Sequence, residues 1–182
     1  RKVRVEYAGA LYHLMSRGDR REPIFLDDED RELFLRTLGN ACGRTGWKVH
    51  SYVLMTNHYH LLVSTPEANL VAGMKWLQGV YTQRFNVRHR YAGHLFQGRY
   101  RALLVDPEEP DYARVVSDYI HLNPARAGLL ETGDGSLESY PWSSYPQFLK
   151  PRGKPPWLGV SEVFGWHGWD ASKAGGRRRY GE

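Results

Sequence analysis

The chain has 182 residues, 41% of them hydrophobic and 13% aromatic, which is enough for a globular domain with its own core and excludes a wholly disordered chain. Its formal net charge is +5, and no apolar run approaches the roughly 20 residues that a membrane-spanning helix needs, so we expect no membrane partner. The single cysteine, Cys42, excludes an internal disulfide and a cysteine-based zinc site, and it favours a reducing, cytoplasmic location.

The predicted elements follow the order strand, helix, strand, strand, helix, strand and a further helix. We expect strands at 10–18, 47–55, 58–64 and 94–105, and helices at about 28–44, 70–90 and 112–123. The two middle strands are too close in sequence for a crossover helix, which predicts an antiparallel hairpin. Asp27 or Asp28 is expected to cap the first helix and Asn69 the second, and Pro124 to stop the third.

This order is typical of an α+β fold of the ferredoxin-like, split βαβ type. One antiparallel sheet carries two helices on one face, with an added C-terminal helix, and we expect the other face to stay open for a site. The periodic pattern fades from about residue 131, so we predict a domain at 1–130 and a C-terminal extension at 131–182. The basic end of that extension, GGRRRYGE, is expected to be either a non-specific phosphate clamp or disordered.

Charge is distributed unevenly along the sequence. Between Leu33 and Val105 the only acidic residue is Glu67, whereas nine residues there are lysine or arginine, with aromatic residues among them. Few carboxylates leave the positive field unneutralised, as a phosphate-binding surface requires, and aromatic rings can stack on unpaired bases. The pattern predicts a nucleic-acid partner; the alternative is a solvated basic face.

The sequence HYHLLV holds two histidines on one face of a predicted strand. His58 and His60 project the same way, whereas Tyr59, Leu61 and Val63 project to the opposite side. The apolar side must face the helices, so we expect both imidazoles on the open face, about 7 Å apart along the strand and able to converge on one ion. The alternative is two incidental polar side chains on a sheet.

The last predicted helix adds two candidate residues. Tyr119 and Asn123 are four apart and therefore share one helical face. Asn123 can supply an amide oxygen, and two imidazoles with an amide oxygen and water suit a divalent cation such as Mg²⁺ or Mn²⁺. Tyr119 would then lie one turn from the cation, where its phenol could attack a bound phosphate. Taken singly, the tyrosine is better explained by packing and the asparagine by its place before proline; together with the histidine pair and the basic stretch they favour a site.

Five sequence blocks, found in this order, resemble the HUH single-tyrosine transposases and in particular the REP-associated tyrosine transposases. They are SRGDRREPIF, LMTNHYHLL, GVYTQRFN, GHLFQGRYRALLV and YIHLNPARAGL, within residues 5–130, and YPWSSY continues the resemblance toward residue 145. The resemblance implies a ferredoxin-like fold, His58 and His60 as metal ligands, Asn123 as the third protein ligand and Tyr119 as the nucleophile. The substrates that it implies are imperfect hairpins in single-stranded DNA.

We therefore expect a metal-dependent transposase that cleaves and rejoins single-stranded hairpin DNA through a 5′-phosphotyrosine, acting as a monomer or homodimer. The sequence lacks a P-loop signature, so no nucleotide cofactor is expected. DNA contacts are expected from a set of arginines: Arg17, Arg20, Arg21, Arg84, Arg88, Arg99 and Arg101. Three alternatives stay open: a non-catalytic module that binds hairpin DNA or RNA, a nicking replication initiator or relaxase, and a hydrolase that uses metal-bound water.

Overall fold

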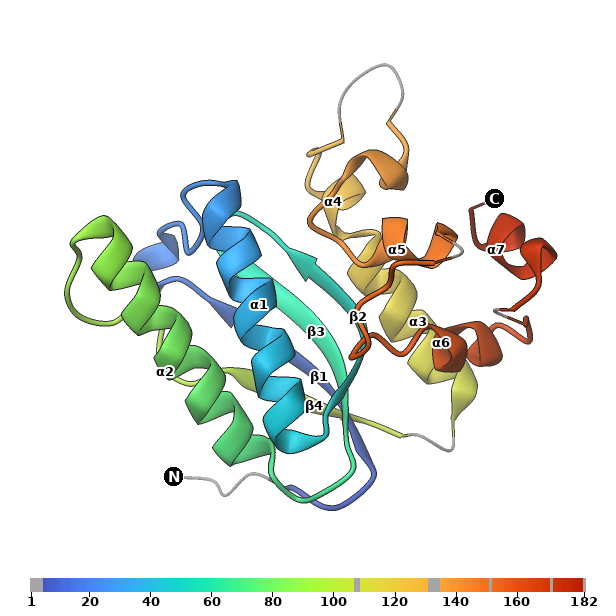
Figure 1. Cartoon of the computed structure of the whole chain (residues 1–182), viewed down its shortest axis with the longest axis horizontal. Helices are drawn as coiled ribbons and strands as arrows, with labels where there is room; N and C mark the ends of the chain where they lie inside the picture. Colours follow the sequence, from blue (N-terminus) through green and yellow to red (C-terminus); the bar gives the residue numbers. More distant parts are fainter. Residues whose placement is uncertain (1–4, 107–108, 131–134, 151, 171, 182) are drawn as a thin grey trace.

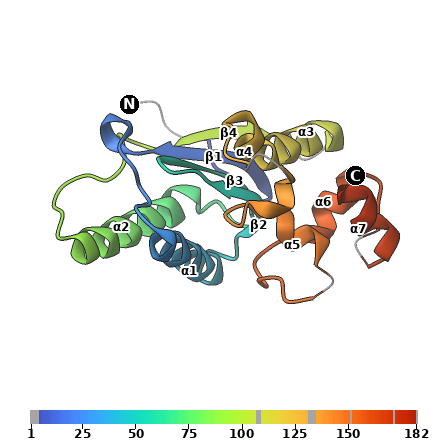
Figure 2. The same ribbon diagram turned by 90° about the horizontal axis from the view of Figure 1, so that it is seen from above.

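A four-stranded antiparallel sheet organises the chain in the computed structural model, which describes residues 5–106, 109–130, 135–150, 152–170 and 172–181. The strands are β1 (Ala10–Arg17), β2 (Lys48–Leu54), β3 (His58–Thr65) and β4 (Arg101–Val105), in the spatial order β2-β3-β1-β4. Helices α1 (Asp28–Thr45) and α2 (Leu70–His89) cover one face, and α3 (Pro110–His121) lies against the other (Figure 1, Figure 2). The predicted α+β, ferredoxin-like architecture is confirmed.

The alternation of side chains along β3 divides the interior into two apolar clusters. Tyr59, Leu61 and Val63 belong to the larger cluster, beneath α1 and α2. Leu62 points the other way and belongs to a smaller cluster with Ile120 of α3. The expectation that this second face stays open is therefore wrong where α3 packs on it.

The helix caps follow the sequence prediction only in part. The Asp27 side chain accepts a hydrogen bond from the Asp30 main-chain N–H at 3.0 Å, which confirms it as the cap of α1. Asn69 makes no such bond to α2. Its side-chain oxygen accepts from the indole N–H of Trp47 at 2.6 Å and its amide donates to the carbonyl of Thr45 at 2.9 Å, so it joins α2 to the end of α1.

Two element boundaries differ from the prediction. The fourth strand begins at Arg101 and not at residue 94, because Gly93 and Gly98 adopt positive φ values of 94° and 62° and turn the preceding segment into a loop. The third helix ends at His121, and Pro124 lies in the short helix α4 (Asn123–Arg126) that follows.

The C-terminal extension pairs with the outer edge of β2. The Val49 main chain exchanges hydrogen bonds with Trp157 at 3.0 Å and Gly159 at 2.7 Å, and the Ser144 N–H donates to the carbonyl of Tyr52 at 2.9 Å. Helices α5 (Tyr145–Leu149), α6 (Val160–Trp166) and α7 (Ala174–Gly181) contribute side chains to the larger cluster. The extension thus shares the core of the sheet; its predicted start at residue 131 lies outside the described residues.

The basic end of the chain is ordered as α7. Tyr180 is buried, whereas Arg178 and Arg179 are exposed. Of the two alternatives predicted for this end, disorder is therefore wrong for residues 174–181, and the phosphate clamp stays a prediction. Across the described ranges, no helix combines the length and the apolar character that a bilayer span requires.

The packing of Gly73 on Trp47 gives a stability prediction. A β-carbon at Gly73 would lie 2.2 Å from the indole ring of Trp47, which its hydrogen bond to Asn69 keeps in place. We expect Gly73→Ala to lower the free energy of unfolding by about 1–3 kcal/mol. Gly79→Ala, on the exposed side of the same helix with nothing within 4 Å, should instead raise it by up to about 1 kcal/mol. Urea denaturation of both variants measures the difference, and equal effects would contradict this packing.

Candidate active site

Two strands and a helix bring three imidazoles and a phenol together. His58 and His60 project from the same face of β3, with ring centroids 5.3 Å apart. His13 of β1 lies next to them, with its ring 5.1 Å from that of His60. The ring of Tyr119, from α3 of the same chain, lies 5.9 Å from His60 and 6.0 Å from His13. The predicted proximity of Tyr119 to the histidine pair is therefore present within one chain.

Hydrogen bonds hold one nitrogen of each paired imidazole. Nδ1 of His58 donates to the side-chain oxygen of Asn57 at 2.8 Å. Nδ1 of His60 lies 2.9 Å from Nε2 of His13, at hydrogen-bonding distance. The amide nitrogen of Asn57 donates to the carbonyl of Arg21 at 3.0 Å, so the same asparagine joins β3 to the loop after β1.

The paired histidines line a cavity of about 620 Å³ on the sheet face that faces α3. Its lining comprises Met15, Ser16, Arg17, Arg21, Asn57, His58, His60, Gln97, Arg99 and Arg101. Four of these residues are arginines and none is acidic, so the cavity has a positive potential suited to phosphate. Four residues of the predicted DNA-binding set thus lie around the histidine pair, and Arg20 is exposed on the adjoining loop.

The loop that carries Arg20 and Arg21 has an unusual backbone. Both residues adopt positive φ values, 50° and 64°, which are rare for side chains other than glycine. Gly18 begins the turn, where a β-carbon would lie 2.0 Å from the carbonyl oxygen of Glu22, so only glycine fits. The tight turn brings Arg21 to the cavity, whereas Arg20 is exposed beside it.

Burial keeps the imidazoles neutral. It lowers the pKa of His60 to about 3 and that of His13 to about 4, with the neighbouring imidazoles adding to the effect at His60. Burial followed by the charge of Arg17 lowers the pKa of His58. Neutral imidazole is the form that binds metal ions.

Two side chains contact Tyr119 from the end of its helix, the predicted ligand Asn123 and the unpredicted Arg126. Asn123 begins α4, and its amide donates to the main-chain carbonyl of Tyr119 at 2.8 Å, a contact that caps the end of α3. Arg126, which the sequence reasoning did not single out, has its guanidinium 5.3 Å from the centroid of the Tyr119 ring. Tyr119 itself is 38% exposed and so accessible to a substrate.

The donor set fits a divalent cation that takes few protein ligands. The described residues contain no group of three or more His, Cys, Asp or Glu placed to hold a metal ion, so a closed structural site is not formed by such residues. Two neutral imidazoles beside an open cavity leave room for water and phosphate oxygens, as a catalytic site requires. His58 and His60 are therefore suitable ligands, and Asn123 stays a predicted one.

Comparison with known proteins gives the family. The family model of IS200-like transposases matches residues 6–123, which is more than half of the chain. The chain belongs to this family. No curated protein matches the chain closely enough to count as a relative.

Solved structures similar to this IS200-like transposase include a REP-associated tyrosine transposase bound to a REP hairpin. That protein is 16% identical, with 88% of this chain and 92% of that chain covered and a TM-score of 0.65. Another is a proposed transposase from Deinococcus radiodurans R1, 20% identical, with 71% and 92% of the two chains covered and a TM-score of 0.46. The first likeness supports the fold derived above.

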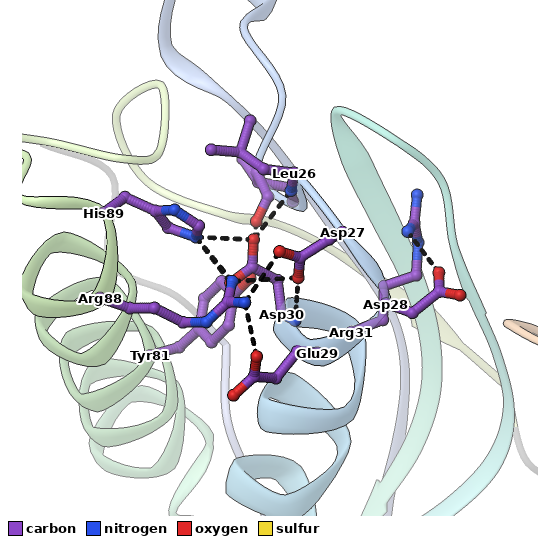
Figure 3. A network of polar contacts seen from close by, with 10 residues as sticks. Leu26, Asp27, Asp28, Glu29, Asp30, Arg31, Tyr81, Arg88 and His89 are labelled. Atoms are coloured by element: carbon purple, nitrogen blue, oxygen red, sulfur yellow. Dashed lines mark hydrogen bonds and ion pairs between the residues drawn. The ribbon is translucent and has the colours of Figure 1, made fainter.

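Two residues of the predicted DNA-binding set lie away from the site of the IS200-like transposase. Arg84 donates to the hydroxyl of Thr37 at 3.0 Å, between α2 and α1. Arg88 binds carboxylates at the start of α1, and Figure 3 shows the guanidinium among them. The contacts are with Asp27 at 2.8 Å, Glu29 at 2.6 Å and Asp30 at 2.8 Å. The prediction that both arginines belong to one DNA-binding surface with Arg99 is thus corrected: they connect the two helices on the opposite face of the sheet.

The placement of Arg88 gives a second prediction. Arg88→Ala removes the guanidinium from the buried Asp30 carboxylate and leaves it only the contacts with His89 and the Leu26 N–H, so we expect thermal unfolding of the variant to begin a few degrees lower. Arg99→Ala, in the cavity, should leave the thermal midpoint unchanged and weaken the binding of single-stranded hairpin DNA. Circular dichroism and fluorescence anisotropy measure the two effects. Equal weakening of DNA binding by Arg88→Ala, at a temperature where it is folded, would contradict the assignment.

Proposed function

We propose that this chain is a metal-dependent tyrosine transposase that cleaves and rejoins single-stranded hairpin DNA through a covalent 5′-phosphotyrosine. The observation that carries the proposal is the proximity of Tyr119 to His60, with ring centroids 5.9 Å apart. His60 in turn lines the arginine-rich cavity. Membership of the IS200-like transposase family supports a transposase over a replication initiator or relaxase, which would use the same phosphotyrosine chemistry. The hairpin is proposed as substrate because the similar REP-associated transposase is bound to one.

In the proposed reaction, the phenolic oxygen of Tyr119 forms a bond to the phosphorus of one phosphodiester. The bond from that phosphorus to the 3′ oxygen of the preceding nucleotide breaks, the phenol loses its proton and the 3′ oxygen gains one. The products are a 5′-phosphotyrosine and a free 3′-OH. Attack by the 3′-OH of another strand reverses the step, so the bond energy is conserved and no nucleotide cofactor is needed.

Charged side chains supply the remaining contributions. The cavity arginines, among them Arg17, Arg99 and Arg101, bind phosphates and hold the strand beside the phenol. Arg126 places a positive charge near the Tyr119 ring, where it favours the developing phenolate. When bound, a divalent cation such as Mg²⁺ or Mn²⁺ would polarise the phosphorus and offset transition-state charge, and we propose His58, His60 and Asn123 as its protein ligands.

The covalent intermediate gives the decisive test. Incubation with 5′- and 3′-labelled hairpin DNA and Mn²⁺ should yield a protein–DNA adduct that resists denaturation. Tyr119→Phe should abolish it, because the attacking oxygen is absent. Tyr112→Phe is the matched control: this tyrosine is also exposed on α3, and its variant should form the adduct at the wild-type rate.

Other results of that assay would contradict the proposal in recognisable ways. Hairpin binding without an adduct under any divalent cation would indicate a non-catalytic DNA- or RNA-binding module. Cleavage that persists in Tyr119→Phe would indicate a hydrolase that uses bound water.

A further prediction separates metal binding from DNA binding. His58→Ala and His60→Ala should each lower the cleavage rate by at least about 100-fold, since the cation stabilises the transition state. Both should retain most of the hairpin affinity, because phosphate contacts with arginine supply it. Single-turnover cleavage and anisotropy on the same preparations measure both quantities. An equal loss of affinity and cleavage would show that the histidines are structural.

A further inference from the structure

Each histidine of the pair has the same nitrogen engaged by a neighbouring side chain. Nδ1 of His58 contacts Asn57 at 2.8 Å, and Nδ1 of His60 contacts His13 at 2.9 Å. The two partners come from different places, the hairpin turn and the neighbouring strand. Both contacts therefore leave Nε2 as the nitrogen available on each ring that lines the cavity.

We propose that His13 and Asn57 are positioning residues that accept a hydrogen bond from the Nδ1–H of His60 and His58 and so leave both Nε2 lone pairs for a divalent cation. This inference deepens the proposed function and rests on it for the identity of the ligand. Partners of this kind fix the tautomer and ring orientation of metal-binding histidines.

The pairing of β1 with β3 brings His13 to His60. Met15 lies opposite His60 in the register and His13 opposite Leu62, so the two imidazoles are diagonal neighbours on one face of the sheet. Both are buried, at 6% and 7% exposed, where an unpaired polar atom is costly. The hydrogen bond between them holds one proton. If that proton were on His13, Nε2 of His60 would carry the other and could not bind a cation.

Asn57 has its orientation set by a second contact. Its amide nitrogen donates to the carbonyl of Arg21, which turns its oxygen toward His58. An amide oxygen only accepts, so Nδ1 of His58 carries the proton and Nε2 is free of one in the neutral ring. The same asparagine thereby fixes the imidazole relative to the loop that presents Arg21 to the cavity.

The tautomers can be measured without metal or DNA. Long-range ¹H–¹⁵N correlation spectra of the metal-free wild-type protein at neutral pH should show His58 and His60 as Nδ1–H tautomers, with signals assigned through His58→Ala and His60→Ala. An Nε2–H tautomer at His60 would overturn the inference for His13, and one at His58 would overturn it for Asn57.

Paired variants test the consequence for metal binding. We expect His13→Phe and Asn57→Leu to raise the Mn²⁺ dissociation constant by about 10- to 100-fold and to mix the tautomers of their partners. His13→Gln replaces the Nε2 acceptor with an amide oxygen near the same position, and Asn57→Asp keeps an oxygen acceptor for His58. Both variants should bind Mn²⁺ nearly as wild type does. Wild-type Mn²⁺ affinity in His13→Phe or in Asn57→Leu would overturn the assignment for that residue. If the tautomers and affinities are as expected but no Tyr119 adduct forms, the proposed function fails and the inference about His13 and Asn57 stands.

Discussion

The packing of α3 on Leu62 determines where the candidate nucleophile lies. Leu62 and His60 occupy successive positions on one face of β3, because side chains two residues apart point the same way. Val116 and Ile120 pack in the apolar cluster that contains Leu62, which places Tyr119 of the same helix beside His60. The hydrophobic contact and the polar site therefore depend on the same strand register. A slip of one residue would turn the histidines into the larger core and separate them from α3.

The arginines on the two faces of the sheet differ in whether nearby carboxylates neutralise their charge. On the face covered by α1 and α2, Arg88 is bound by three carboxylates from the N-cap and the first turn of α1, so its charge is neutralised locally. On the other face, four arginines line the cavity, and none of its lining residues in the described part of the chain is acidic. The potential at a site depends on this local balance more than on the net charge of the chain. The net charge of +5 is thus a poor guide to where phosphate would bind.

The part of the site that depends on local sequence could be predicted, and the part that depends on strand pairing could not. The alternation in HYHLLV predicts that His58 and His60 share a face, and Asp27 before an amphipathic segment predicts a helix start; both are confirmed. His13 gave no signal, because a lone histidine in a strand becomes informative only when the register with β3, 47 residues away, is known. Arg88 misled for the same reason: its partners lie about 60 residues earlier in the sequence.

The C-terminal extension completes the support of α3. His121 is the last residue of α3 and is buried. Its Nε2 lies 2.6 Å from the hydroxyl of Ser144, and its Nδ1 lies 2.7 Å from the hydroxyl of Tyr180 in α7. Burial lowers the pKa of His121 to about 3, so the ring stays neutral and can make one bond as donor and one as acceptor. Asp118, beside Tyr119, contacts His167 after α6 at 3.2 Å. The helix that carries Tyr119 is thus held by the sheet on one side and by the extension on the other. The attacking oxygen of a phenol must be positioned relative to the phosphate with a precision of a few tenths of an ångström. A helix fixed from two sides provides that precision better than one packed only on the sheet.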